Sequence, residues 1–163
     1  MDVALRTVLV GIGATATVDL WSVVARRLFA MPSSNWALVG RWIGHLPRGR
    51  FRHVDIAKAE GLPGERVIGW SAHYVIGIAF AALLVLIAGP AWLATPTVGA
   101  ALLAGLCTLI APFFVMQPAM GYGIASAHAR NPTAARLRSF ANHAVFGLGL
   151  YASALVIAAA TDG

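Results

Sequence analysis

Apolar residues fall in four long runs along the chain, and polar segments separate the runs. The runs cover residues 3–25, 68–93, 97–120 and 139–160. A helix needs about 20 mostly apolar residues to cross the hydrocarbon core of a bilayer, where it satisfies its own backbone hydrogen bonds. The pattern therefore predicts an all-α polytopic membrane protein. We expect a four-transmembrane-helix bundle that forms a single integral membrane domain over residues 1–163.

Composition supports this fold class. Hydrophobic residues make up 59% of the chain and charged residues only 11%, whereas a soluble domain is about 45–50% apolar and about 25% charged. The first apolar run ends in Arg26-Arg27 and follows no basic segment. We therefore expect it to be a retained membrane helix rather than a cleaved signal peptide.

The net charge of +6 is concentrated between the apolar runs. Most Lys and Arg residues lie in the loop 26–67 or in the segment that contains Arg130, Arg136 and Arg138, whereas the turn 94–96 has no charge. The positive-inside rule places both basic segments in the cytoplasm and both termini on the opposite side. Because this distribution is that of a membrane protein, we expect no nucleic-acid partner.

The first loop contains its own structural signals. Residues 33–35 (Ser-Ser-Asn) provide a helix N-cap, residues 36–43 mix tryptophan with aliphatic side chains, and Pro47 ends the segment. This pattern predicts a short helix in the membrane interface. A basic run follows it, and we consider four arginines as candidate ligands of anionic lipid headgroups: Arg41, Arg48, Arg50 and Arg52. The alternative is a solvated loop whose charges only set the topology.

Each span also carries polar side chains at a similar depth, about 5–10 Å below the expected cytoplasmic boundary at 1.5 Å of helix rise per residue. These residues are Asp19, His73, Gln117 and the adjacent pair Asn142 and His143. Burying an ionisable group in hydrocarbon costs several kcal/mol, so such groups face a partner, water or a substrate. The cluster is either a functional site or a set of interhelical hydrogen bonds that fixes the bundle.

Three chemistries fit the cluster. A transition metal could take Asp19, His73, His143 and Met116 as ligands. Haem b could be held by the two histidines, with Gly77 and Gly147 leaving room for the macrocycle. The third is a protonatable element in a transport path. No Gly-rich phosphate loop, nucleophile elbow or pair of catalytic carboxylates is present, so the sequence does not decide whether the protein is an enzyme.

The third span is expected to break near its end. Two prolines and two glycines fall within a short stretch there: Pro112, Pro118, Gly121 and Gly123. Proline removes a helical hydrogen bond and kinks the helix. Broken helices expose backbone groups near substrate sites in transporters, although an ordinary kinked helix end would have the same sequence.

Two spans share a short pattern. Residues 70–77 and 140–147 both read aromatic-x-x-His-x-Val-x-Gly, and both enter from the expected cytoplasmic side. Two helical hairpins of equal orientation would constitute a parallel duplication, as in some transporters. The match is short enough that coincidence is the alternative.

The remaining features add little chemistry. Cys107 is the only cysteine, so no intrachain disulfide forms. His45, His53 and His128 lie in loops, where we expect them to be solvated or to lie in the membrane interface. The small-residue segment 99–105 is expected to face a second copy of the chain, because small residues let transmembrane helices approach closely. We therefore expect a homo-oligomer or a complex with a partner membrane protein.

Several motifs together resemble a known family. They are Gly-Arg-Trp-Ile-Gly-His at 40–45, Pro-Arg-Gly-Arg-Phe-Arg-His at 47–53, Gly-Glu-Arg with Gly-Trp and His-Tyr at 64–74, and Met-Gln-Pro-x-Met-Gly at 116–121. The chain resembles, over nearly its whole length, an uncharacterised domain-of-unknown-function family of small bacterial integral membrane proteins with four predicted transmembrane helices. The resemblance implies the bacterial inner membrane, and it assigns no activity or catalytic residue. In that membrane, the termini that the positive-inside rule places outside would be periplasmic.

From the residues, transport or ion and proton passage is the leading functional hypothesis. It rests on the buried polar cluster, the broken third span and the duplicated pattern. A haem- or metal-binding redox protein is the second hypothesis, with His73 and His143 as ligands. A non-catalytic subunit or assembly partner of a larger membrane complex is the third.

Overall fold

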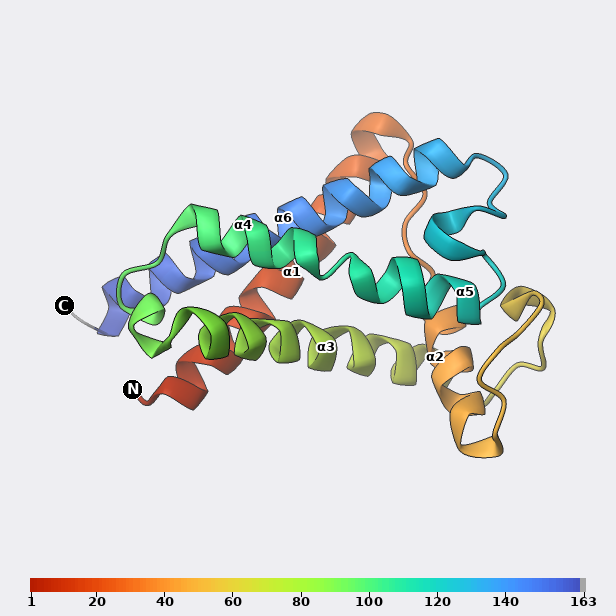
Figure 1. Cartoon of the computed structure of the whole chain (residues 1–163), viewed down its shortest axis with the longest axis horizontal. Coiled ribbons are helices and arrows are strands. Elements are labelled where there is room, and N and C mark those ends of the chain that lie inside the picture. Colours follow the sequence, from red (N-terminus) through yellow and green to blue (C-terminus); the bar gives the residue numbers. More distant parts are fainter. Residues whose placement is uncertain (162–163) are drawn as a thin grey trace. The chain divides into compact units, whose positions relative to one another are not determined.

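The computed structural model describes residues 1–161, and every regular element in this range is helical (Figure 1). The predicted domain extends to Gly163, so its last two residues lie outside the described range. The helices are, in order, α1 (Val3–Phe29), α2 (Trp36–His45), α3 (Glu65–Ala88), α4 (Val98–Cys107), α5 (Gln117–Ala119) and α6 (Pro132–Thr161). The predicted all-α class is confirmed.

Four helical segments are long and apolar enough to cross a membrane, as predicted. They are Val3–Phe29, Glu65–Ala88, Val98–Ala119 and Pro132–Thr161. The second ends earlier than expected because Gly89 has a φ of 84° and Pro90 follows it. The fourth begins earlier because the Asn131 side chain accepts a hydrogen bond from the Ala134 amide at 3.1 Å, which caps the new helix.

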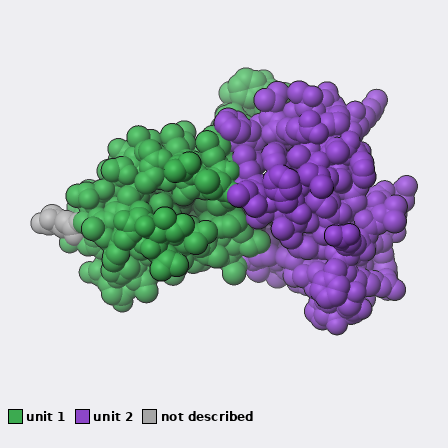
Figure 2. Space-filling view, in the orientation of Figure 1, with its two compact units in different colours: residues 1–33, 74–108, 141–163 green, residues 34–73, 109–140 purple. Residues whose placement is uncertain are grey.

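The chain forms two compact units, each built from separated stretches of sequence (Figure 2). Unit 1 comprises residues 1–33, 74–108 and those from 141 onward. Unit 2 comprises residues 34–73 and 109–140. Unit 1 contains most of the transmembrane helices, and unit 2 contains the long first loop, the end of the third span and the starts of α3 and α6.

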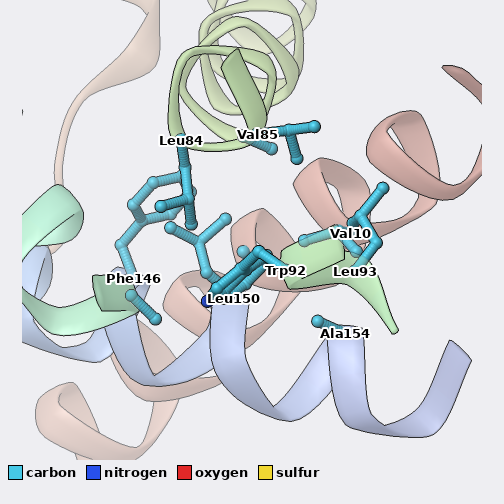
Figure 3. Packing of buried hydrophobic residues seen from close by; sticks show 11 residues of the cluster. Val10, Leu84, Val85, Trp92, Leu93, Phe146, Leu150 and Ala154 are labelled. Atoms are coloured by element: carbon cyan, nitrogen blue, oxygen red, sulfur yellow. The ribbon is translucent and has the colours of Figure 1, made fainter. Parts of the chain in front are cut away.

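Unit 1 has a single apolar core between α1, α3, α4, α6 and the 3₁₀ turn Pro90–Leu93 (Figure 3). The buried side chains include both small alanines and large aromatic and aliphatic groups, so large side chains of one helix can pack beside small residues of another. The core residues are Val10, Ala14, Ala81, Leu84, Val85, Trp92, Leu93, Ala101, Phe146, Leu150 and Ala154. Since lipid tails are as apolar as these side chains, close packing rather than the hydrophobic effect holds the helices together.

Glycines mark the closest approaches of the helices in unit 1. A Cβ atom on Gly77 of α3 would overlap the Thr15 side chain of α1. In the same way, a Cβ on Gly147 of α6 would lie 2.8 Å from the carbonyl oxygen of Ala101 on α4. Both glycines close the pattern shared by residues 70–77 and 140–147. The same position in each copy therefore contacts the preceding span, which is the arrangement that a duplication of hairpins requires.

The small-residue segment 99–105 does not face outward as a whole. Ala101 is fully buried in the core of unit 1, and a Cβ on Gly105 would lie 2.7 Å from the Cα of Gly147. The expectation that this segment faces a second copy is therefore wrong for these two residues, because α6 of the same chain occupies their face.

Unit 2 is organised by α2 lying against the start of α3. Gly40 and Gly69 allow contact between the two backbones, because a Cβ on either residue would overlap the opposite main chain. The predicted helix is present, and the Asn35 side chain caps it by accepting from the Ala37 amide at 3.1 Å. A second apolar core, separate from that of unit 1, includes residues of α2. Its buried side chains are Val39, Ile56 and Met120, and the partly buried side chains packed against them are Trp36, Leu38, Trp42, Ile43, Ala59, Met116 and Tyr122.

Two glycines of α4 give a matched test of this packing. Gly105→Ala should lower the free energy of unfolding by about 1–3 kcal/mol, because its Cβ would lie 2.6 Å from the His143 carbonyl oxygen. Gly99→Ala should be neutral or stabilising by up to about 1 kcal/mol, because no atom lies within 4 Å of the new methyl group. Thermal unfolding in mild detergent measures both. Equal stability of the two variants would contradict the packing.

Candidate functional site

Asp19 of α1 has a hydrogen-bond partner on α3. The Tyr74 hydroxyl donates to Asp19 Oδ2 at 2.8 Å, and both side chains are partly buried in unit 1. The two residues meet because α1 and α3 run antiparallel through the contact between Thr15 and Gly77. One turn further along α1 lies Asp19, and one turn back along α3 lies Tyr74. A phenol donating to a carboxylate is a strong, charge-assisted hydrogen bond.

Tyr74 is a site residue that sequence reasoning did not identify. The sequence did contain a signal for Tyr74, because a tyrosine hydroxyl that is buried needs a hydrogen-bond partner. The sequence does not say, however, whether Tyr74 or its neighbour His73 faces Asp19, since that choice depends on the rotation of α3 about its axis.

His143 of α6 has a hydrogen-bond partner just beyond the end of α4. Its Nδ1 lies 2.6 Å from Thr108 Oγ1, and this hydroxyl lies 2.5 Å from the Gly105 carbonyl oxygen. A hydroxyl has one proton, and Thr108 donates it to the carbonyl, which has none. His143 Nδ1 is then the donor to Thr108, so Nε2 is the unprotonated nitrogen of the neutral ring. Thr108 follows directly after α4 and was also missed by sequence reasoning.

Each hairpin holds one hydrogen-bonded polar pair, but the two pairs differ in register. His143 aligns with His73 in the duplicated pattern, whereas the partner of Asp19 is Tyr74, one residue further along α3. Thr108 also lies about two turns beyond Ala101, the residue that Gly147 approaches, whereas Asp19 lies one turn beyond Thr15. The repeat therefore rests on the two glycine contacts and does not extend to the polar pairs.

Asn142 connects α6 to a different helix. Its Oδ1 accepts a hydrogen bond from Trp21 Nε1 of α1 at 3.1 Å. Adjacent residues of α6 thus reach two neighbours, Asn142 toward α1 and His143 toward the end of α4. Unit 1 therefore holds three of the five predicted site residues, each with a defined partner.

The other two predicted residues belong to unit 2. His73 stacks on Trp36 with ring centroids 3.9 Å apart, and Trp70 lies edge-on to it at 5.8 Å. Gln117 is buried and its Oε1 accepts from Ser126 Oγ at 2.9 Å. The predicted cluster of Asp, His, Gln and His is thus divided between the two units.

The third span is broken where the sequence predicted irregularity. Helix α4 ends at Cys107, and a π-helical turn follows at Pro112–Met116. Pro112 lacks the backbone N–H that a regular turn needs, which favours the wider turn. Such π-helical turns occur frequently at functional sites. The break begins at Thr108, the residue that contacts His143.

The geometry offers little to a metal ion or a haem. Within residues 1–161, no group of three His, Cys, Asp or Glu side chains is arranged to hold a metal ion. The side chain of Met116 packs against the core of unit 2. The expectation that Gly77 and Gly147 leave room for a macrocycle is wrong, because α1 and α4 fill the space beside them.

Arg41 forms the main polar contact of the first loop. Its guanidinium donates to both Glu65 carboxylate oxygens, at 2.8 and 2.9 Å. It also donates to the carbonyl oxygens of Ile56, Ala57 and Ala59, at 3.0–3.3 Å. The hydrogen bonds to Glu65 raise the pKa of Arg41 above its ordinary value. The side chain thus ties α2, the loop and α3 together, while Arg48, Arg50 and Arg52 are exposed.

The expectation that His45 is solvated is wrong. Its side chain is fully buried at the end of α2, and its Nδ1 lies 2.8 Å from His53 Nε2. Burial lowers the pKa of His45, and the charges near it, those of His53, Arg50 and Arg48, lower it further. His128 is exposed, as expected. The burial follows from the loop folding back over α2, which the local sequence does not reveal.

Comparison with known proteins agrees with the resemblance noted from the motifs. A family model described as a protein of unknown function, DUF2938, matches residues 8–157. No curated protein and no solved structure matches the chain.

The burial of His45 predicts a pH dependence of stability. Its pKa is lower in the folded protein than the value of about 6.5 in the unfolded chain. The folded state then binds fewer protons, so its stability is complete above pH 6.5 and decreases as pH falls below that value. One such group contributes a slope of at most about 1.4 kcal/mol per pH unit.

Unfolding in detergent between about pH 8 and pH 5 measures this slope, with pH limits chosen around the ordinary histidine pKa. We expect His45→Gln to flatten the slope and His128→Gln, at the exposed histidine, to leave it as in wild type. An unchanged slope in His45→Gln would exclude His45 as the cause.

Proposed function

We propose a function from the site itself, because the chain belongs to the DUF2938 family, whose function is unknown. The proposal is transport or ion passage across the membrane, with Asp19 as the protonatable group. It rests on one observation above all: an aspartate within a membrane-spanning helix accepts a hydrogen bond from Tyr74 on the next span. Ionisable residues inside spans commonly mark ion pathways and proton relays.

The chemistry of the pair suits a reversible proton site. When Asp19 is ionised, the Tyr74 hydroxyl stabilises the charge by donating to it at 2.8 Å. When Asp19 is protonated, the carboxyl keeps an acceptor oxygen for the same hydroxyl and gains an O–H donor of its own. Both protonation states are therefore accommodated without breaking the contact between α1 and α3.

The second hairpin supplies a further group of the same kind. His143 is oriented by Thr108 at the break in the third span, and the unprotonated Nε2 can accept a proton. A histidine that is held by one nitrogen and can take up a proton at the other is suited to proton transfer. We infer that the two polar pairs serve one path, and that the duplicated hairpins form its walls.

The proposed setting follows from the sequence. We propose that the ends of the spans near Asp19 and His143 lie on the cytoplasmic side of a bacterial inner membrane, with both termini periplasmic, because the basic loops adjoin those ends. Because four helices enclose little volume, we propose that the working form is a homo-oligomer or a complex with another membrane protein. These statements are proposals that native mass spectrometry in detergent and cysteine accessibility can test.

The two alternative functions are tested separately. A redox protein that binds haem through His73 and His143 would show a visible absorption spectrum after gentle purification, whereas transport requires none. A non-catalytic subunit would copurify with a defined larger complex and would conduct nothing alone. The glycine contacts on α3 and α6 count against the haem alternative, and no observation specifically favours the subunit.

Asp19→Asn gives the main functional test. We expect the variant to fold, because an amide is close to a carboxyl in size and also accepts the Tyr74 hydrogen bond. Its stability should fall by about 1 kcal/mol or less. Proton flux should fall at least tenfold, because the amide cannot exchange a proton near neutral pH. The measurement is acidification of dye-loaded proteoliposomes under an imposed potassium diffusion potential.

Asp2→Asn is the matched control on the same helix. Asp2 caps α1 by accepting from the Leu5 amide at 2.8 Å, and asparagine caps equally well. Its flux should equal that of wild type. If Asp19→Asn is stable and retains full flux, Asp19 is not the protonatable group. If wild type shows no flux above empty liposomes, the proposed function is wrong.

A further inference from the structure

A segment of the first loop is fastened to the end of the third span. We call residues 48–56 the strap. The His53 amide donates to the Ala119 carbonyl oxygen at 2.8 Å, and the Ile56 amide donates to the Met120 carbonyl oxygen at 3.1 Å. The span ends at Ala119. These bonds therefore fix the strap to the end of the third span, where a membrane boundary is expected.

The contact depends on a glycine. A Cβ on Gly121 would overlap the Val54 carbonyl group, and Gly121 also has a φ of 95°, which favours glycine. The main chain of the strap can therefore lie directly against the main chain that follows the span. Its position is a property of the fold of unit 2.

The strap holds two large apolar side chains away from the protein. Phe51 is 63% exposed and Val54 is 97% exposed. Hydrogen bonds hold the main chain around Phe51 in this position. The Phe51 carbonyl accepts from Trp42 Nε1 at 3.1 Å, and the Arg50 amide donates to the His45 carbonyl. Exposed apolar residues on the spanning helices face lipid tails, but these two lie outside any span. Apolar side chains at a membrane boundary are typical of segments that insert into the interface.

The apolar side chains alternate with exposed positive charges. Arg48, Arg50 and Arg52 are all exposed. Of the acidic groups in the same loop, Asp55 pairs with Lys58 at 3.5 Å, Glu65 pairs with Arg41 at 2.8 Å, and Glu60 is exposed. The strap therefore presents three positive charges and two apolar side chains together. That combination is complementary to a membrane surface, which has anionic headgroups on the outside and acyl chains beneath them.

An open groove of about 570 Å³ lies beside the strap. One side is formed by His53 and Val54 of the strap, and the other by residues 118–128 that follow the third span, including Ile124 and His128. Its walls are mostly apolar with two imidazoles. Such walls fit the glycerol and upper acyl region of a lipid better than they fit a free ion.

We propose that the strap and its groove form a binding surface for anionic phospholipid at the membrane boundary. Arg48, Arg50 and Arg52 contact the phosphate groups, Phe51 and Val54 insert below them, and the groove seats one lipid. Arg41, although it lies in the same loop, takes no part because its donors are used within the protein. The proposal is independent of proton passage through unit 1.

Binding of short-chain phosphatidylglycerol and phosphatidylcholine to the delipidated full-length protein tests the proposal by native mass spectrometry. Wild type should bind phosphatidylglycerol at least tenfold more tightly. A basic residue near an anionic surface contributes about fivefold, so R48Q/R50Q/R52Q should weaken phosphatidylglycerol binding by up to about a hundredfold. Phe51→Ser with Val54→Ser should weaken the binding of both lipids while keeping the preference.

The matched control is R26Q/R27Q/R66Q, which removes the same charge from three other exposed arginines. It should keep both affinity and preference. Thermal unfolding of each variant without lipid distinguishes lost binding from lost folding. Equal binding of the two lipids by wild type, or wild-type binding by R48Q/R50Q/R52Q, would overturn the proposal. Displacement of the lipid by inorganic phosphate or an acidic peptide would overturn it as well, because the site would then bind soluble anions.

Discussion

Close contact between helix backbones at small residues positions the rest of unit 1. Spanning helices satisfy their own backbone hydrogen bonds, and in lipid they gain little from the hydrophobic effect, so they associate where packing is tightest. Gly77 against Thr15 and Gly147 against Ala101 are two such places. The contacts fix the register of each antiparallel helix pair, and the register decides which polar side chains meet further along the two helices.

The polar pairs follow from this constraint. Asp19 meets Tyr74 in the first hairpin, and Thr108 meets His143 in the second, although the two pairs differ in register. Each pair satisfies groups that would otherwise be costly in a membrane. The second pair also coincides with the point where the third span loses regular helix, so the break and the histidine form one local feature. The proposal of proton or ion passage rests on this arrangement.

Features that depend on local sequence were predicted correctly. Features that depend on the rotation of a helix about its axis, or on how a loop folds, were missed. The apolar runs predicted the four spans, and Pro112 and Pro118 predicted the break in the third span. Tyr74 could not be chosen over His73 as the partner of Asp19 without the rotation of α3. The burial of His45 and the use of Arg41 within the loop depend on contacts between segments far apart in sequence. Asn131 is a recognisable N-cap residue in the sequence, and using it would have placed the start of α6 correctly.

Infrared difference spectroscopy of the protein in lipid membranes tests the central claim most directly, because it detects the protonation of a carboxyl group itself. On acidification, wild type should gain a carboxyl C=O band that is absent from Asp19→Asn. In Tyr74→Phe the band should remain but change frequency, because the hydrogen bond to Asp19 is lost, whereas Tyr151→Phe on α6 should leave it as in wild type. A set of pH-dependent carboxyl bands in Asp19→Asn identical to that of wild type, or an Asp19 band unaffected by Tyr74→Phe, would contradict the account.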